Sequence, residues 1–229
     1  MKRSLLALAA ASALLLTGCA SDSNTAGKTG FVERILAGPL TYADIDDALL
    51  TVDDLPAGWS VDPDGSDDGD DSKTSSDSPE CDLLVAAMEA DDDSGATPVG
   101  EGEATFRKSK RGPFLLQSIT SFEGNEAKKS VKAFRTAFET CDSFTETGDD
   151  GTKVTFKVSP MAFPSLGDDT VALRLSARSA GIRVVAPLIV VRVDQNLMLL
   201  ASAGIKKRLP AEDLETVART AVTKIKAAN

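Results

Sequence analysis

Two nearly continuous apolar runs, Arg183 to Val193 and Leu197 to Ala203, most constrain what this chain can fold into. Apolar runs that do not alternate are typical of strands covered on both faces. The residues between them, Asp194 to Asn196, are of the kinds that form tight turns. We therefore expect a central β-hairpin. Pro187 interrupts the first run, and because proline cannot donate to a strand ladder, it predicts a bulge or a local edge there.

Other segments show the period of half-buried strands or of amphipathic helices. Alternation predicts strands within residues 102–108, 114–122, 153–158 and 171–178. Helical spacing predicts helices within 42–50, from Ser78, from Asn125 as the cap to Cys141, and from Pro210 to about Lys226. Hairpins interspersed with helices, with about five strands before the last helix, indicate an α+β fold. We expect a single twisted, mainly antiparallel sheet with helices packed on it.

Cys81 and Cys141 fall on the apolar faces of two of these predicted helices. An even pair of cysteines in an exported protein favours a disulfide, and a buried position favours a structural one. The bridge would join helix to helix and close a loop of about 60 residues, with a stabilisation of roughly 4 kcal/mol. Free thiols, or a metal site with two thiolates, are the alternatives.

The amino-terminal segment has the order of a secretory signal. Lys2 and Arg3 precede an apolar run that ends in Leu16-Thr17-Gly18-Cys19, and this ending resembles a bacterial lipobox. The run is about a dozen residues long, whereas a membrane-spanning helix needs about 20. The resemblance implies a signal peptide over 1–18, cleavage before Cys19 and a diacylglycerol on its sulfur. Acyl chains on Cys19 would then hold the protein on the outer leaflet of the cytoplasmic membrane, at its extracytoplasmic face.

Residues 19–40 are expected to form a lipidated amino terminus and flexible tether, and residues 41–229 a binding domain. Within that domain, residues 62–77 are rich in aspartate, glycine and serine and predict a disordered acidic loop. Calcium is the alternative there. However, an EF-hand pattern started at Asp62 places Asp67 where the glycine should be and Lys73 where the final glutamate should be.

Composition excludes several functions. Histidine is absent, which excludes Ser-His-Asp and Cys-His catalysis within this chain, and histidine metal sites. A formal net charge of −10 argues against a nucleic-acid partner. We therefore predict no catalytic residues, no cofactor and no metal ligand. One basic stretch, Arg107 to Arg111, is predicted as a hairpin tip that either contacts lipid phosphates or an acidic wall polymer, or only protects a sheet edge.

Several features coincide along the chain. They are the lipobox, the segment Leu49 to Trp59, the two helix-terminal cysteines, Leu166-Gly167-Asp168-Asp169 before alternating strands, and Val191-Arg192-Val193 before a tight turn. Together they resemble the PknH-like extracellular sensor domain family of actinobacterial lipoproteins and receptor-kinase ectodomains, over roughly Ala43 to Lys226. The resemblance implies an α+β fold with flanking helices and a cleft that binds a ligand. Kinase members usually carry two disulfides, whereas this chain has cysteines for one.

Three observations lead to one expectation of function. They are the lipobox, which indicates export and lipid anchoring, the exclusion of histidine-based catalysis, and the family resemblance. We expect a membrane-anchored extracytoplasmic lipoprotein with a non-enzymatic, ligand-binding or sensor-like domain, whose partner is an envelope ligand or protein. The alternatives are a lipid or glycolipid carrier, a carboxylate-dependent envelope hydrolase, and a purely structural envelope protein. A smooth apolar cleft favours the carrier, two carboxylates facing one pocket favour the hydrolase, and a body without a concave pocket favours the structural protein.

Overall fold

The computed structural model describes residues 38–63, 65, 78, 81, 82, 84, 85, 97–147, 153–179, 182–204 and 209–229. The predicted signal peptide, Cys19 and nearly all of the tether lie outside the described residues, as does most of the predicted acidic loop at 62–77. The described body belongs to one compact unit, Ala37–Asn229. None of its described helices is long and apolar enough to cross a membrane.

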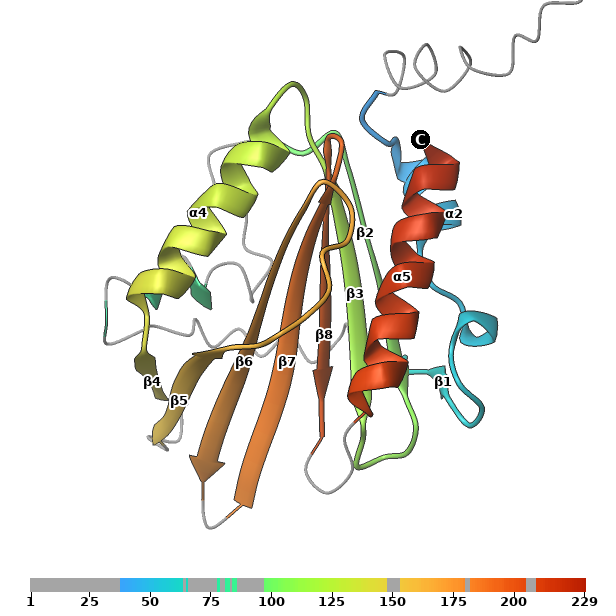
Figure 1. Cartoon of the computed structure of the whole chain (residues 1–229). Helices are drawn as coiled ribbons and strands as arrows, with labels where there is room; N and C mark the ends of the chain where they lie inside the picture. The colour runs from blue at the N-terminus through green and yellow to red at the C-terminus, as the bar shows by residue number, and fades with distance from the viewer. Residues whose placement is uncertain are drawn as a thin grey trace, which may run out of the picture. The chain divides into compact units, whose positions relative to one another are not determined.

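Eight strands of the described body form one sheet, and every neighbouring pair is antiparallel (Figure 1). Their order across the sheet is β1-β2-β3-β8-β7-β6-β5-β4. The strands are β1 (Ser60–Val61), β2 (Gly100–Arg107), β3 (Phe114–Ser121), β4 (Ser143–Thr147), β5 (Lys153–Pro160), β6 (Asp169–Ser179), β7 (Ile182–Val193) and β8 (Asn196–Ala203). This confirms the predicted α+β class with a mainly antiparallel sheet.

The two apolar runs form the central strands β7 and β8, as predicted. Their side chains alternate between two separate cores. In β7, Ile189 and Val191 belong to one core, whereas Leu188 and Val190 belong to the other. Both faces of the hairpin are therefore buried, which explains why its sequence lacks the polar positions of a half-exposed strand.

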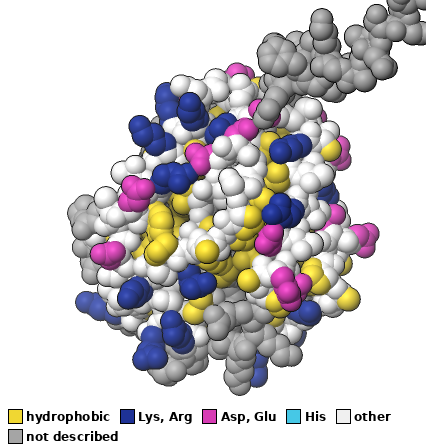
Figure 2. Space-filling model, in the orientation of Figure 1, with side chains coloured by type: hydrophobic (Ala, Val, Ile, Leu, Met, Phe, Trp, Pro, Cys, Tyr) yellow, Lys and Arg dark blue, Asp and Glu magenta, His cyan; other side chains and the backbone are white. Residues whose placement is uncertain are grey.

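The first core lies under α2 (Tyr42–Ala48) and α5 (Ala211–Ala228). The predicted apolar face of the last helix is confirmed, since Leu214, Val217, Ala218, Ala221 and Ile225 are all buried. Between α4 and α5 none of the described helices lies in front of the sheet (Figure 1), and apolar side chains reach the surface there (Figure 2).

A pair of hydrogen bonds caps the start of α2, and an equivalent pair caps the start of the short 3-10 helix η1 (Val52–Asp54). The Thr41 backbone N–H and hydroxyl both donate to the Asp44 carboxylate, and these bonds hold the pKa of Asp44 below its usual value. Asp54 accepts equivalent bonds from Thr51 and a third from Lys224 Nζ, at 3.0 Å. Burial opposes the ionisation of Asp54, but these bonds outweigh it and lower its pKa. The Asp54–Lys224 pair ties η1 to α5.

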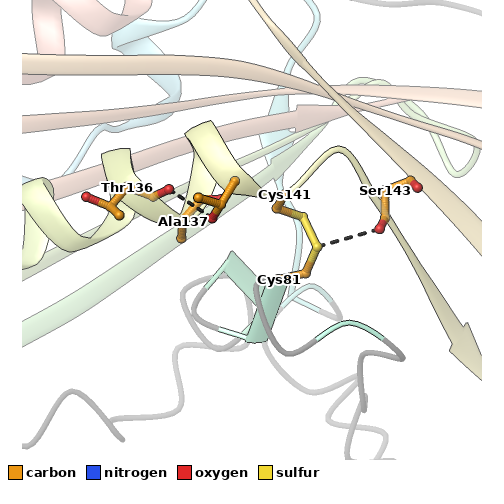
Figure 3. The surroundings of a disulfide bond; sticks show 6 residues. Cys81, Thr136, Ala137, Cys141 and Ser143 are labelled. Carbon is orange, nitrogen blue, oxygen red and sulfur yellow. Dashed lines mark hydrogen bonds between the residues drawn. A yellow bond between two sulfur atoms is a disulfide. The ribbon is translucent and has the colours of Figure 1, made fainter.

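The second core lies under α4 (Glu126–Thr140) and the helical residues around Cys81. Cys81 and Cys141 form a disulfide across a sequence separation of 60, as predicted (Figure 3). Both are at most 2% exposed, so the bridge is a buried structural link between the Cys81 turn and the end of α4. Asn125 precedes α4 as predicted, but its side chain makes no capping hydrogen bond because its φ of −117° and ψ of 16° are not the extended backbone of a cap.

Candidate ligand-binding pocket

A pocket forms where β7 and β8 separate. Their pairing runs from the turn to Leu188 opposite Ala201 and stops there. Beyond that point residues 182–187 of β7 pair only with β6, and Ser202 and Ala203 pair only with β3. Pro187, which has no N–H to offer to β8, lies at this point in an unbroken ladder with β6. The prediction of a local edge at Pro187 is therefore confirmed, and the alternative of a bulge is not.

The start of α5 roofs the gap between the two strands, and the resulting cavity has a volume of about 290 Å³. Its lining residues are mostly apolar: Met161, Arg174, Val185, Pro187, Ser202, Ala203, Leu209, Pro210, Ala211 and Leu214. The Ser202 hydroxyl donates to the Phe114 carbonyl oxygen at 2.9 Å, so its proton is engaged within the sheet. Arg174 is the one charged residue among the described lining residues, and it is also exposed. The cavity thus offers an apolar surface with one guanidinium group open to solvent.

The lining determines what the pocket can do chemically. No carboxylate and no thiol are among the lining residues that the structure describes, so these offer no pair of acids for glycoside hydrolysis. Elsewhere in the described residues, no three Cys, Asp or Glu side chains gather as a metal site would require. The pocket is suited to hold the apolar part of a ligand while an anionic group of the same ligand contacts Arg174.

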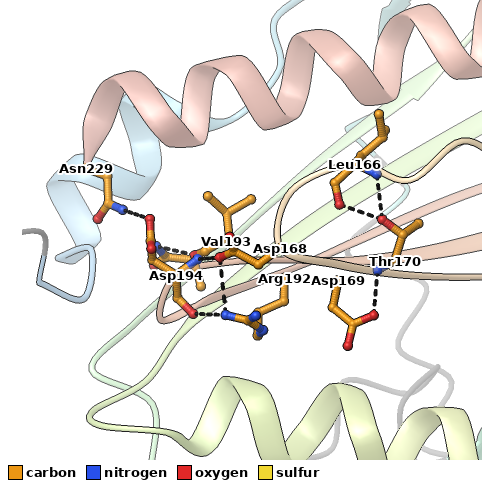
Figure 4. Close-up of polar contacts among 9 residues, drawn as sticks. Leu166, Asp168, Asp169, Thr170, Arg192, Val193, Asp194 and Asn229 are labelled. Atoms are coloured by element: carbon orange, nitrogen blue, oxygen red, sulfur yellow. Dashed lines mark hydrogen bonds and ion pairs between the residues drawn. The ribbon is translucent and has the colours of Figure 1, made fainter. Parts of the chain in front are cut away.

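The segment Leu166-Gly167-Asp168-Asp169 forms a turn at the other end of the sheet, before β6 (Figure 4). Gly167 has a φ of +60°. The Asp168 carboxylate accepts the Asp194 backbone N–H at 2.7 Å and Arg192 Nη1 at 3.2 Å. The Thr170 hydroxyl donates to the Leu166 carbonyl oxygen at 2.6 Å. These contacts hold the segment before β6 against the β7–β8 turn.

The predicted basic tip is the turn between β2 and β3, but its first residue has a partner. Arg107 Nη1 donates to Asp62 Oδ1 at 2.8 Å, and Asp62 is buried. Lys108, Lys110 and Arg111 are exposed. Trp59 is buried immediately before β1, where it anchors the core at the start of a strand and is not open for stacking on a ligand.

The fold has a counterpart among solved structures. The crystal structure of the extracellular domain of PknH from Mycobacterium tuberculosis aligns with 82% of this chain and 98% of its own, with a TM-score of 0.61. This chain has the PknH extracellular-domain fold. Sequence identity is 12%, so the likeness concerns the fold alone and confirms the family resemblance at that level. Comparison with protein-family models and with curated protein sequences gives no match.

Little in the sequence predicts this pocket. Pro187 was the only lining residue whose pattern indicated a local irregularity. Arg174 looked like any charged residue on the wet face of an alternating strand. Its place beside the pocket depends on the pairing of β6 with β7 and on the position of α5, neither of which is local to Arg174.

Proposed function

We propose that this chain is a lipid-anchored extracytoplasmic protein whose PknH-like body binds an amphiphilic ligand and catalyses no reaction. The observation that carries the proposal is the pocket between β7, β8 and α5, whose described lining is apolar apart from Ser202 and the guanidinium group of Arg174. The rival hydrolase requires two carboxylates facing one pocket, and this lining contains none. A purely structural envelope protein requires no concave pocket.

The size and lining of the pocket define the ligand class. A volume of about 290 Å³ lies at the lower limit of ligand pockets, so it accommodates a short acyl chain or a small ring rather than a whole lipid. Each Å² of apolar surface removed from water contributes about 25 cal/mol. An anionic group beside Arg174 adds a charge-assisted hydrogen bond. The ligand best matched to the site is therefore a small apolar molecule with one negative charge.

Decanoate is expected to bind the purified chain, and Ala211→Trp is expected to weaken binding more than tenfold because the indole fills the cavity. Arg174→Gln should weaken the binding of decanoate but not of uncharged decanol. Isothermal titration calorimetry measures each of these affinities. Thr216→Trp, which places the same side chain at an exposed position of α5, is the matched control and should bind as wild type. Wild-type affinity in the Ala211→Trp variant would contradict the assigned pocket.

The anchor is tested separately. Cells expressing the chain and fed an alkyne-bearing palmitate analogue are expected to label it, and Cys19→Ala is expected to abolish the label. The reason is that the proposed acyl chains are carried by the residue at which the lipobox is cleaved. Ser21→Ala, two residues further on, should keep the label at equal expression. Equal labelling of Cys19→Ala and wild type would exclude the anchor while leaving the pocket untouched.

A further inference from the structure

One face of β5, β6 and β7 carries an unusual concentration of positive charge. Strand alternation places five exposed cations on the side of the sheet that also carries α5: Lys153, Lys157, Arg174, Arg178 and Arg183. We call this set the basic sheet face. Figure 2 shows Lys and Arg side chains gathered toward the lower left of this side of the molecule. The concentration contrasts with the net charge of −10 of the whole chain.

The strand register brings these cations close together. Arg178 lies directly opposite Arg183 on β7 and opposite Thr155 on β5, and neighbouring strands are about 4.8 Å apart. Lys157 lies opposite Ser176, the residue between Arg174 and Arg178 on the same face. Like charges placed opposite each other destabilise a sheet. This arrangement therefore gains stability from an external anion.

Nothing within the described sheet neutralises the face. Asp169 is the one acidic residue in β5, β6 and β7, and alternation puts it on the opposite face, where it pairs with Arg135 of α4. None of the five cations makes an ion pair with another described residue. The positive charge of the basic sheet face is thus left for a partner.

The position of the basic sheet face distinguishes between two classes of partner, a membrane surface and a polymer. Arg178 and Arg183 flank the β6–β7 turn, whereas the Leu40 N–H donates to Asn196 Oδ1 beside the β7–β8 turn at the other end of the sheet (Figure 1). Arg183 and Val193, near these two ends of β7, are about 33 Å apart at 3.3 Å per residue. Arg178 and Arg183 therefore lie at the end of the sheet remote from Leu40, the first segment of the described body.

Large exposed apolar residues strengthen attachment to a bilayer, and none of the described residues on the α5 side of β5, β6 and β7 is one. The exposed large apolar residues of the described body are Tyr42, Val52 and Val61, on α2, η1 and β1. A polymer chain, in contrast, can bind through contacts within this face alone, without approaching the acidic residues on the rest of the surface. The placement therefore favours a polymer over a membrane surface.

We propose that the basic sheet face binds a linear, phosphate-bearing polymer. Three of its five cations are arginines, whose planar forks donate two parallel hydrogen bonds to phosphate oxygens. The hydroxyl group of Ser176 lies among the cations on the same face and adds a neutral donor. The face has no aromatic side chain on which a neutral sugar could stack. The basic sheet face can therefore recognise the charge of a ligand but not the face of a sugar ring.

The test uses the full chain and sodium polyphosphate, with affinity measured by calorimetry at low and high salt. The triple variant Lys157→Gln, Arg178→Gln, Arg183→Gln should bind more than tenfold more weakly, and wild-type binding should weaken as salt rises. None of these three residues lines the decanoate pocket, so the two proposals fail or succeed separately. The variant should unfold at no lower temperature than wild type, because it removes like-charge repulsion.

The matched control is a triple variant at exposed positions of α4, Lys128→Gln, Lys129→Gln, Lys132→Gln, which makes the same change in charge on another face. It should bind polyphosphate within twofold of wild type. An equal loss in both triple variants would show attraction without a site and would overturn the proposal. Binding to anionic phosphatidylglycerol vesicles but not to polyphosphate would assign the face to a membrane instead. Equal binding of polyglutamate would overturn the preference for phosphate.

Discussion

Replacing Cys81 and Cys141 together by alanine is expected to lower the free energy of unfolding by about 4 kcal/mol. The bridge closes a loop with a sequence separation of 60, and without it the unfolded chain regains the conformational freedom of that loop. The bridge also holds the turn at Cys81, with the buried Leu84 and Val85, against α4. Urea unfolding, followed by the fluorescence of the single tryptophan, Trp59, measures the change.

Wild-type protein unfolded in the presence of a reductant is the control for this double variant. It should lose a similar amount of stability, because the same cross-link is missing. The oxidised wild type and the double variant would share one unfolding midpoint if the bridge contributed nothing. That result would contradict the structural role assigned to the disulfide.

Gly167→Ala is expected to lower the free energy of unfolding by about 3 kcal/mol, through two effects that add. The first is conformational, since Gly167 has a φ of +60° and residues with a Cβ disfavour this region by about 1 kcal/mol. The second is steric: a Cβ at this position would lie 2.4 Å from the Arg192 carbonyl oxygen and 2.8 Å from Val191 Cγ1. Because the nearest atom belongs to the backbone of β7, relief requires movement of a central strand.

Gly124→Ala separates the two effects. Gly124 has a similar φ of +64°, but a Cβ there would meet nothing within 4 Å. This control should lose only the conformational part, about 1 kcal/mol. Chemical denaturation of both variants gives the comparison. Equal losses in the two variants would show that the β7 backbone yields easily and that the contact between Gly167 and Arg192 has no energetic weight.

Much of the fold could be predicted because its signals are local. The alternation in β5 and β6 and the apolar stripe of α5 each lie within one element. β4 is the strand to which no residue pattern pointed. Phe144 is the only apolar residue in Ser143–Thr147, and it is buried against Phe156 of β5, with ring centroids 5.1 Å apart. The other four residues are polar, as an edge strand permits, so the segment reads as a loop.

The pocket and the basic sheet face could not be predicted because both depend on pairing between distant segments. The pocket exists because the β7–β8 ladder ends at Leu188 and Ala201 while α5 begins beside the gap. Arg178 and Arg183 look like ordinary exposed residues in their own strands. Only the register, which sets them opposite each other, makes them part of one surface.

The first and last described segments of the body meet at the same turn. The Leu40 N–H donates to Asn196 Oδ1, and Asn229 Nδ2 donates to Asp194 Oδ2 at 3.1 Å. A unit whose ends are neighbours can be inserted into a surface loop of a host protein, or have its ends joined and be reopened elsewhere, without disturbing its packing. Such a cassette is easily transferred between chains of very different architecture.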